Sequence, residues 1–105
     1  MIVAFVLAAA LAQAPAFPPA TIWIVGDGNW SCATWLSDEA HKESGEIWVH
    51  GYFSGLNSAF GRQVGHATDS AGIIGEVEKD CRDRPSDALI AAAQSAFRRM
   101  AAADK

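Results

Sequence analysis

Apolar and polar residues recur with helical spacing over most of the chain that follows residue 28. The longest such stretch runs from Gly45 to Gly61 and is apolar around most of its circumference at about 3.6 residues per turn. Its apolar positions are Ile47, Trp48, Val49, Tyr52, Phe53, Leu56, Ala59 and Phe60. This pattern predicts one buried central helix that packs on several sides and around which the other elements are organised.

Two glycines and one polar stripe interrupt the apolar surface of this stretch. Gly51 and Gly55 lie one turn apart, and because glycine lets another backbone approach closely, we expect both to be helix-packing positions. The polar stripe contains His50, Ser54 and Asn57 at i, i+4 and i+7, so these side chains share one edge. That edge is the best candidate for a binding site. For Asn57 the alternative is a hydrogen bond to a buried backbone group of a neighbouring segment.

Upstream of the central helix, the pattern predicts a short extended segment and then a helix. Residues 21–25 form a β-like run, which a turn signal at 26–28 ends. We expect this run to be an extended arm that docks Trp23 on the helices. Asn29 or Ser31 can cap a helix that continues through Glu43, and Ser44-Gly45 is expected to separate it from the central helix.

Two further helices are predicted downstream. Asp69 caps the first of them and Pro85 ends it, and Ser86 or Asp87 starts the second. The expected inward positions are Ile73, Ile74, Val77 and Cys81 in the first and Leu89, Ala92, Ala93, Ala96, Phe97 and Met100 in the second. The fold class predicted for the chain is therefore all-α, a small bundle of about four helices preceded by a short extended or β-like segment.

The beginning of the chain has the pattern of an export signal. Residues 1–12 are uninterruptedly apolar, and the small residues of Ala10-Leu11-Ala12 predict cleavage after residue 12, with cleavage after residue 14 as an alternative. Prolines from Pro15 onward stop the apolar run short of the roughly 20 residues that cross a bilayer, so no membrane span is expected after processing. Residues 13–20 form a Pro-rich leader, and residues 21–105 form a single helical domain.

The charge and the cysteine content of the chain limit the kinds of partner and ligand that we expect it to bind. The 105 residues carry 8 basic and 12 acidic side chains, a net charge of −4, and scattered basic residues leave no footprint for nucleic acid. Cys32 and Cys81 are an isolated pair, which in an exported chain predicts one disulfide. The alternatives are free thiols or a metal site. Since neither cysteine lies in a Cys-x-x-Cys or has a histidine at ligand spacing, we expect no metal and no cofactor.

Ser54 and His50 carry the one enzymatic alternative, a small serine-dependent hydrolase. The run Gly-Tyr-Phe-Ser-Gly at 51–55 is one residue out of register with the Gly-x-Ser-x-Gly nucleophile elbow, and no strand precedes it. With Asp69 or Asp80, Ser54 and His50 supply the three residue types of a Ser-His-Asp triad. A position in the middle of a helix denies the serine an oxyanion hole, so the favoured interpretation is a small residue chosen for helix contact.

Tryptophans are numerous for a chain of this length: Trp23, Trp30, Trp35 and Trp48. Core packing around the disulfide is the main expectation, because indole rings bury large apolar areas. The alternative is an exposed recognition surface formed by Trp23 and Trp30, which flank the turn at 26–28.

Three motifs together resemble a group of small exported proteobacterial proteins, mostly uncharacterised. They are Cys32-x-x-Trp35-Leu36, Trp48-x-x-Gly51-Tyr52-x-Ser54-Gly55-x-Asn57 and Glu76-x-x-x-x-Cys81-x-x-x-Pro85, and the match covers about two thirds of the chain. More distantly, a signal peptide, four helices and one disulfide resemble the periplasmic acid-stress chaperones of the HdeA type. The Gly-Tyr-x-x-Gly helix beside a cysteine resembles the Tai-type immunity proteins that neutralise cell-wall amidase toxins.

These resemblances and the sequence patterns together predict a periplasmic or secreted protein without enzymatic activity. Its expected partner is another envelope protein, bound either in the manner of a stress chaperone or in that of an immunity-like inhibitor. No functional residue of either family can be matched to a position of this chain.

Overall fold

The computed structural model describes residues 22–104, so the predicted signal peptide at 1–12, the leader at 13–20 and Thr21 lie outside the described residues. The elements in chain order are the 3₁₀ turn η1 (Asp27–Asn29) and the helices α2 (Cys32–Trp35), α3 (Glu39–Phe60), α4 (Ser70–Asp83) and α5 (Leu89–Ala103). The described residues form no strand, and an isolated antiparallel bridge joins Ser31 to Ala88. The predicted all-α fold of four helices with one disulfide is therefore confirmed.

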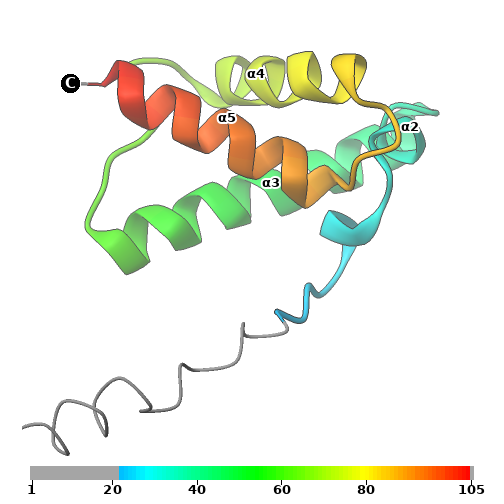
Figure 1. The fold of residues 1–105 in the computed structure, drawn as a ribbon, viewed down its shortest axis with the longest axis horizontal. Coiled ribbons are helices and arrows are strands. Elements are labelled where there is room, and N and C mark those ends of the chain that lie inside the picture. The colour runs from blue at the N-terminus through cyan, green and yellow to red at the C-terminus, as the bar shows by residue number, and fades with distance from the viewer. Residues whose placement is uncertain (1–21, 105) are drawn as a thin grey trace, which may run out of the picture.

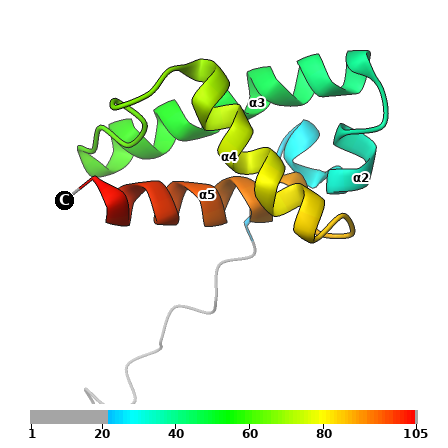
Figure 2. The same cartoon turned by 90° about the horizontal axis from the view of Figure 1, so that it is seen from above.

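The bundle is built on α3 and α5, with α4 lying across them. Figure 1 shows that α4 runs antiparallel to α5, whereas α3 runs in the same sense as α5. In Figure 2, α4 crosses diagonally over the other two helices, and α2 lies at the end of the bundle opposite the C-terminus. No helix within residues 22–104 is long and apolar enough to cross a membrane.

The disulfide joins Cys32 at the start of α2 to Cys81 in α4, and both cysteines are fully buried. Backbone hydrogen bonds reinforce this connection: Cys32 N donates to Asp87 O at 2.7 Å, and Leu89 N donates to Trp30 O at 2.8 Å. The predicted disulfide between Cys32 and Cys81 is confirmed. A helix of four residues has too few internal hydrogen bonds to persist alone, so these cross-links hold α2 in place.

The core is apolar and is shared by all four helices. Trp35 is fully buried, and its indole Nε1 donates to the carbonyl of Lys42 at 3.0 Å, so its one polar atom is satisfied. Phe53 and Phe97 meet edge to face with 5.2 Å between ring centroids, which joins α3 to α5. The buried apolar residues are Cys32, Trp35, Val49, Phe53, Val64, Ile74, Val77, Cys81, Leu89, Ala92, Ala93 and Ala96.

The boundary between the first two helices differs from the prediction. Ser31 caps α2 as expected, but α2 ends at Trp35, and α3 is continuous through Ser44-Gly45. The cause is Asp38, whose carboxylate accepts from the backbone N–H of His41 at 2.8 Å and starts the new helix. The predicted break at Ser44-Gly45 is wrong, because glycine is used there for packing inside the helix.

Both C-terminal helices have the inward faces that their periodicity predicts. Asp69 caps α4 through the N–H of Gly72, and the helix ends at Asp83, before Pro85, as predicted. The predicted start of α5 is wrong, since its N-cap is Ala88, which has no side chain to accept a hydrogen bond. The first N–H of the helix instead donates to Trp30 O, so a backbone group from another segment replaces the capping side chain.

Candidate functional site

The three residues of the predicted polar stripe occupy different surroundings. Asn57 is half-buried and forms two hydrogen bonds with the backbone of Val64, one to its carbonyl at 3.1 Å and one from its N–H at 2.9 Å. It therefore fastens the connection between α3 and α4 to the end of α3. The alternative that Asn57 bonds a backbone group of a neighbouring segment is confirmed.

His50 lines a pocket of about 370 Å³ between α3 and α4, next to Glu46 and Glu78. Its Nε2 atom is buried and has no hydrogen-bond partner within residues 22–104. Lys42 joins the two glutamates, with Nζ at 3.1 Å from Glu46 and 2.5 Å from Glu78. Burial opposes the ionisation of Glu78, but hydrogen bonds from Lys42 and Arg82 outweigh it and lower the pKa of Glu78. The charges beside His50 are thus paired with one another.

Ser54 is exposed in the middle of α3. Among residues 22–104, no hydrogen bond joins its hydroxyl to His50. A general base must reach the serine proton, and within the described residues His50 is not bonded to the hydroxyl that it would have to activate. The small hydrolase remains a prediction to which the geometry adds no support.

The glycines of α3 have roles opposite to those predicted. A Cβ added at Gly51 or Gly55 would meet nothing within 4 Å, so neither residue packs against another element of the described chain. At Gly45, in contrast, an added Cβ would overlap the indole ring of Trp35. The helix-packing prediction for Gly51 and Gly55 is wrong, because α3 has its partners on one face only and both glycines lie on the other.

A surface of exposed apolar side chains lies where the chain enters the bundle. In the extended arm of residues 22–25, Ile22, Trp23 and Val25 are 72%, 84% and 74% exposed. Ile47, which directly precedes Trp48 in α3, is 74% exposed. The prediction that Trp23 docks on the helices is wrong. We call these four residues the apolar arm surface.

Trp48 anchors this arm to α3. Its indole Nε1 donates to the carbonyl of Val25 at 2.9 Å, and its ring stacks on Tyr52 with centroids 5.2 Å apart. Ser44 lies one turn before Trp48 in α3, and its hydroxyl donates to the carboxylate of Asp27 at 2.5 Å. A Cβ at Gly28 would overlap the Trp48 ring, so glycine is required there for the close approach. The arm is thus held by hydrogen bonds, while the side chains of Ile22, Trp23 and Val25 stay in solvent.

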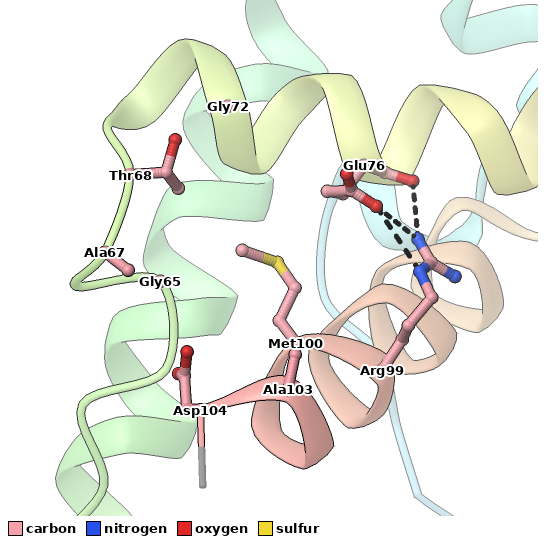
Figure 3. Close-up of a pocket in the computed structure, with 9 residues that line it drawn as sticks. All are labelled: Gly65, Ala67, Thr68, Gly72, Glu76, Arg99, Met100, Ala103 and Asp104. Atoms are coloured by element: carbon pink, nitrogen blue, oxygen red, sulfur yellow. Dashed lines mark hydrogen bonds and ion pairs between the residues drawn. The ribbon is translucent and has the colours of Figure 1, made fainter.

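A second pocket, of about 320 Å³, lies at the other end of the bundle and is drawn in Figure 3. It is bordered by the connection at 65–68, the first half of α4 and the last turns of α5, and it is open to solvent. Met100 extends into it from α5, with Ala67 and Ala103 beside it (Figure 3). Three charged side chains lie at its rim, Glu76 and Arg99 at one side and Asp104 at the other (Figure 3).

Arg99 is held in an ion network between α5 and α4. Its guanidinium donates to the Glu76 carboxylate at 2.9 Å, to the Glu76 carbonyl at 3.1 Å and to the Asp80 carboxylate at 3.0 Å. Hydrogen bonds from Lys79 and then from Arg99 lower the pKa of Glu76. All these groups lie at the surface, so the network fixes the relative position of the two helices more than it adds stability.

Sequence reasoning missed both the second pocket and the ion network. Glu76, Asp80 and Arg99 are not among the inward positions of their own helices, so periodicity within one helix does not show that they meet. The available signal was the spacing: Glu76 and Asp80 lie one turn apart and so present two carboxylates to a single cation on a facing helix.

No family model, no curated protein and no solved structure matches this chain. The resemblances to exported proteobacterial proteins, acid-stress chaperones and immunity proteins therefore remain predictions from the motifs. Within residues 22–104, no three His, Cys, Asp or Glu side chains are placed together to hold a metal ion.

Proposed function

We propose that this chain is an exported, non-enzymatic protein of the bacterial envelope that binds apolar segments of other proteins through the apolar arm surface. The observation that carries the proposal is the exposure of Ile22, Trp23, Val25 and Ile47 in a bundle whose buried side chains are all apolar. Three of these four side chains lie within residues 22–25, and apolar side chains grouped in solvent are a feature of binding sites. Tryptophan is also the residue type that most often dominates the energy of a protein interface.

The anchoring of the arm supports a binding role. Trp48 donates to the backbone carbonyl of Val25 and Ser44 to the side chain of Asp27, so the arm is attached to α3 at these two residues. Binding to a surface already in place avoids the entropic cost of ordering it at the moment of association. The apolar arm surface is therefore suited to bind a segment that adapts to it.

Charges at the edge of this surface indicate the chemistry of the partner. Asp27 lies beside the arm, and Glu43 lies one turn before Ile47 on the exposed side of α3. A segment that combines apolar with basic residues would complement this acidic edge. We therefore propose a non-native or extended polypeptide segment of apolar and basic composition as the partner.

Export is supported by two features of the chain. Residues 1–12 have the composition of a signal peptide, and the bond between Cys32 and Cys81 is of the kind that persists in oxidising compartments. The proposed location is the periplasm or the extracellular medium.

The binding proposal is tested with protein purified from the periplasmic fraction of its host. If the protein is absent from that fraction, the proposed export is contradicted. The probe is a fluorescently labelled peptide of leucine, phenylalanine and lysine, and its binding is measured by fluorescence anisotropy. A second peptide has glutamate in place of lysine. We expect the lysine peptide to bind more tightly, and Trp23→Ala to weaken it by about tenfold or more.

Phe60→Ala is the matched control, because Phe60 is 69% exposed but lies at the far end of α3. Binding should be unchanged in this variant. Equal losses in Trp23→Ala and Phe60→Ala, or no binding of either peptide, would overturn the proposal. Selective binding of a folded hydrolase without peptide binding would favour the immunity-like version instead.

An acid-stress chaperone should loosen as the pH falls. The pKa values of Glu76 and Glu78 are lowered in the folded state, so their ionised forms contribute stability above the ordinary carboxyl pKa and lose it as the pH drops through the folded values. We expect the urea midpoint to fall and binding of an apolar dye to rise between about pH 5 and pH 2. Glu76→Gln should reduce this pH dependence, and Asp83→Asn, an exposed control on α4, should not. Dye binding that stays flat to pH 2 would contradict the chaperone version.

A further inference from the structure

We propose that the pocket of Figure 3 binds a primary ammonium group carried on a short apolar chain. The pocket has a volume of about 320 Å³, at the small end of the range of ligand sites, which suits a few methylene groups and one polar head. It lies at the end of the bundle where α5 ends, away from α2 (Figure 1).

One wall of the pocket is apolar. The side chain of Met100 reaches from α5 toward the connection at 65–68, and Ala67 and Ala103 add methyl groups (Figure 3). Gly65 and Gly72 line the pocket without side chains, and a Cβ at Gly65 would crowd Ile73 at 2.8 Å. The unbranched thioether of methionine adapts to irregular apolar ligands, so this wall accepts an alkyl chain.

Arg99 lies at the rim but has no free donor for an anionic ligand. Its Nε and both terminal nitrogens already donate to Glu76 or Asp80, at distances from 2.9 to 3.3 Å. Two carboxylates also offset its single positive charge. An anion entering the pocket would therefore have to break this network, which disfavours phosphate and carboxylate ligands.

Asp104 supplies the acceptor that a cation needs. Its carboxylate is directed into the pocket (Figure 3), and its side chain is 21% exposed. Its ionic neighbour within the described residues is His66, with 3.9 Å between Nδ1 and the carboxylate, beyond hydrogen-bond distance. The residue also stands at the C-terminus of α5, where the helix dipole is negative. The carboxylate and the dipole act together to favour a positive charge.

A ligand whose ammonium group lies at the Asp104 carboxylate and whose alkyl chain lies along Met100 matches both the charged and the apolar part of the pocket. The same chemistry is offered by a free amine, such as a diamine, and by a lysine side chain of another protein. This site is separate from the apolar arm surface, so its occupancy does not depend on the proposed function.

The test follows the ε-methyl resonance of Met100 in ¹H–¹³C NMR spectra of the oxidised protein during titration with n-butylammonium. We expect a saturable shift with half-saturation in the millimolar range, as befits so small a ligand. Asp104→Asn should weaken binding by about tenfold or more, since a charge-assisted contact is lost. Asp83→Asn, which changes an acidic residue outside the pocket by the same chemistry, should leave the titration unchanged.

Neutral n-butanol and anionic butyrate are the matched ligands, and both should bind more weakly than n-butylammonium. Tighter binding of Nα-acetyl-lysine methylamide than of n-butylammonium would support the proposal with a protein side chain as the source. Weaker binding would support it with a free amine. No saturable shift, equal affinity for n-butanol, or full affinity in Asp104→Asn would overturn it.

Discussion

Replacing Cys32 and Cys81 together with alanine lowers the free energy of unfolding by about 4 kcal/mol, the entropy that the cross-link removes from an unfolded chain of this loop length. The two cysteines are 49 residues apart in sequence and fully buried in the fold. The loss is a large share of the net stability of a small domain, about 5–15 kcal/mol. Urea unfolding followed by tryptophan fluorescence measures it.

Reduction of the unmodified protein is the control for this experiment. It should lower the urea midpoint of the unmodified protein toward that of the alanine variant and leave the variant itself unchanged. If the variant and the oxidised protein unfold at the same urea concentration, the bond does not stabilise the fold. In that case α2 must be held by its backbone hydrogen bonds to residues 85–89 alone.

Gly45→Ala destabilises the protein by about 1–3 kcal/mol, although alanine is the better helix former. The added methyl would overlap the indole of Trp35 and approach Leu89 at 3.2 Å, and both of these side chains are fully buried. Trp35 has little freedom to move, because its Nε1 is bonded to the carbonyl of Lys42. Thermal or urea unfolding of the variant measures the loss.

Gly51→Ala and Gly55→Ala are matched controls in the same helix. Nothing lies within 4 Å of the added methyl at either position, so each change should raise stability by up to about 1 kcal/mol, the difference in helix propensity. The same substitution of glycine by alanine is thus expected to lower stability at position 45 and to raise it at positions 51 and 55. A stabilising Gly45→Ala would mean that Trp35 does not pack on α3 as described. Destabilising changes at Gly51 and Gly55 would reveal an element that covers this face in solution.

Periodicity alone was enough to predict the inward faces of α4 and α5. Residues such as Val77, Cys81 and Ala93 recur at helical spacing because each helix has a single buried stripe, which is a local property of the chain. The same reasoning failed for α3. Its apolar residues extend around most of the helix, but Ile47 is exposed because no element of the described chain covers that side.

The candidate sites were predictable only where one segment carried the signal. The disulfide was predicted from two cysteines in a chain whose first residues have the pattern of an export signal, and Asn57 was recognised as a residue able to bond a neighbouring backbone. The pocket around Met100 is assembled from three segments that are separate in sequence, and no spacing rule within one segment reveals it. The prediction of where α5 starts was wrong for the same reason, since the first N–H of the helix donates to the carbonyl of Trp30, which is distant in sequence.

The bond between Cys32 and Cys81 also closes most of the bundle into a covalent ring. Both the exposed turn after α3, at Gly61 and Arg62, and the N-terminal part of α4 lie inside that ring. A protease that cuts the backbone there leaves two fragments that stay joined, with α3 on one and α5 on the other. The oxidised protein would thus keep its helices together after a first cleavage, whereas the reduced protein would separate into two pieces.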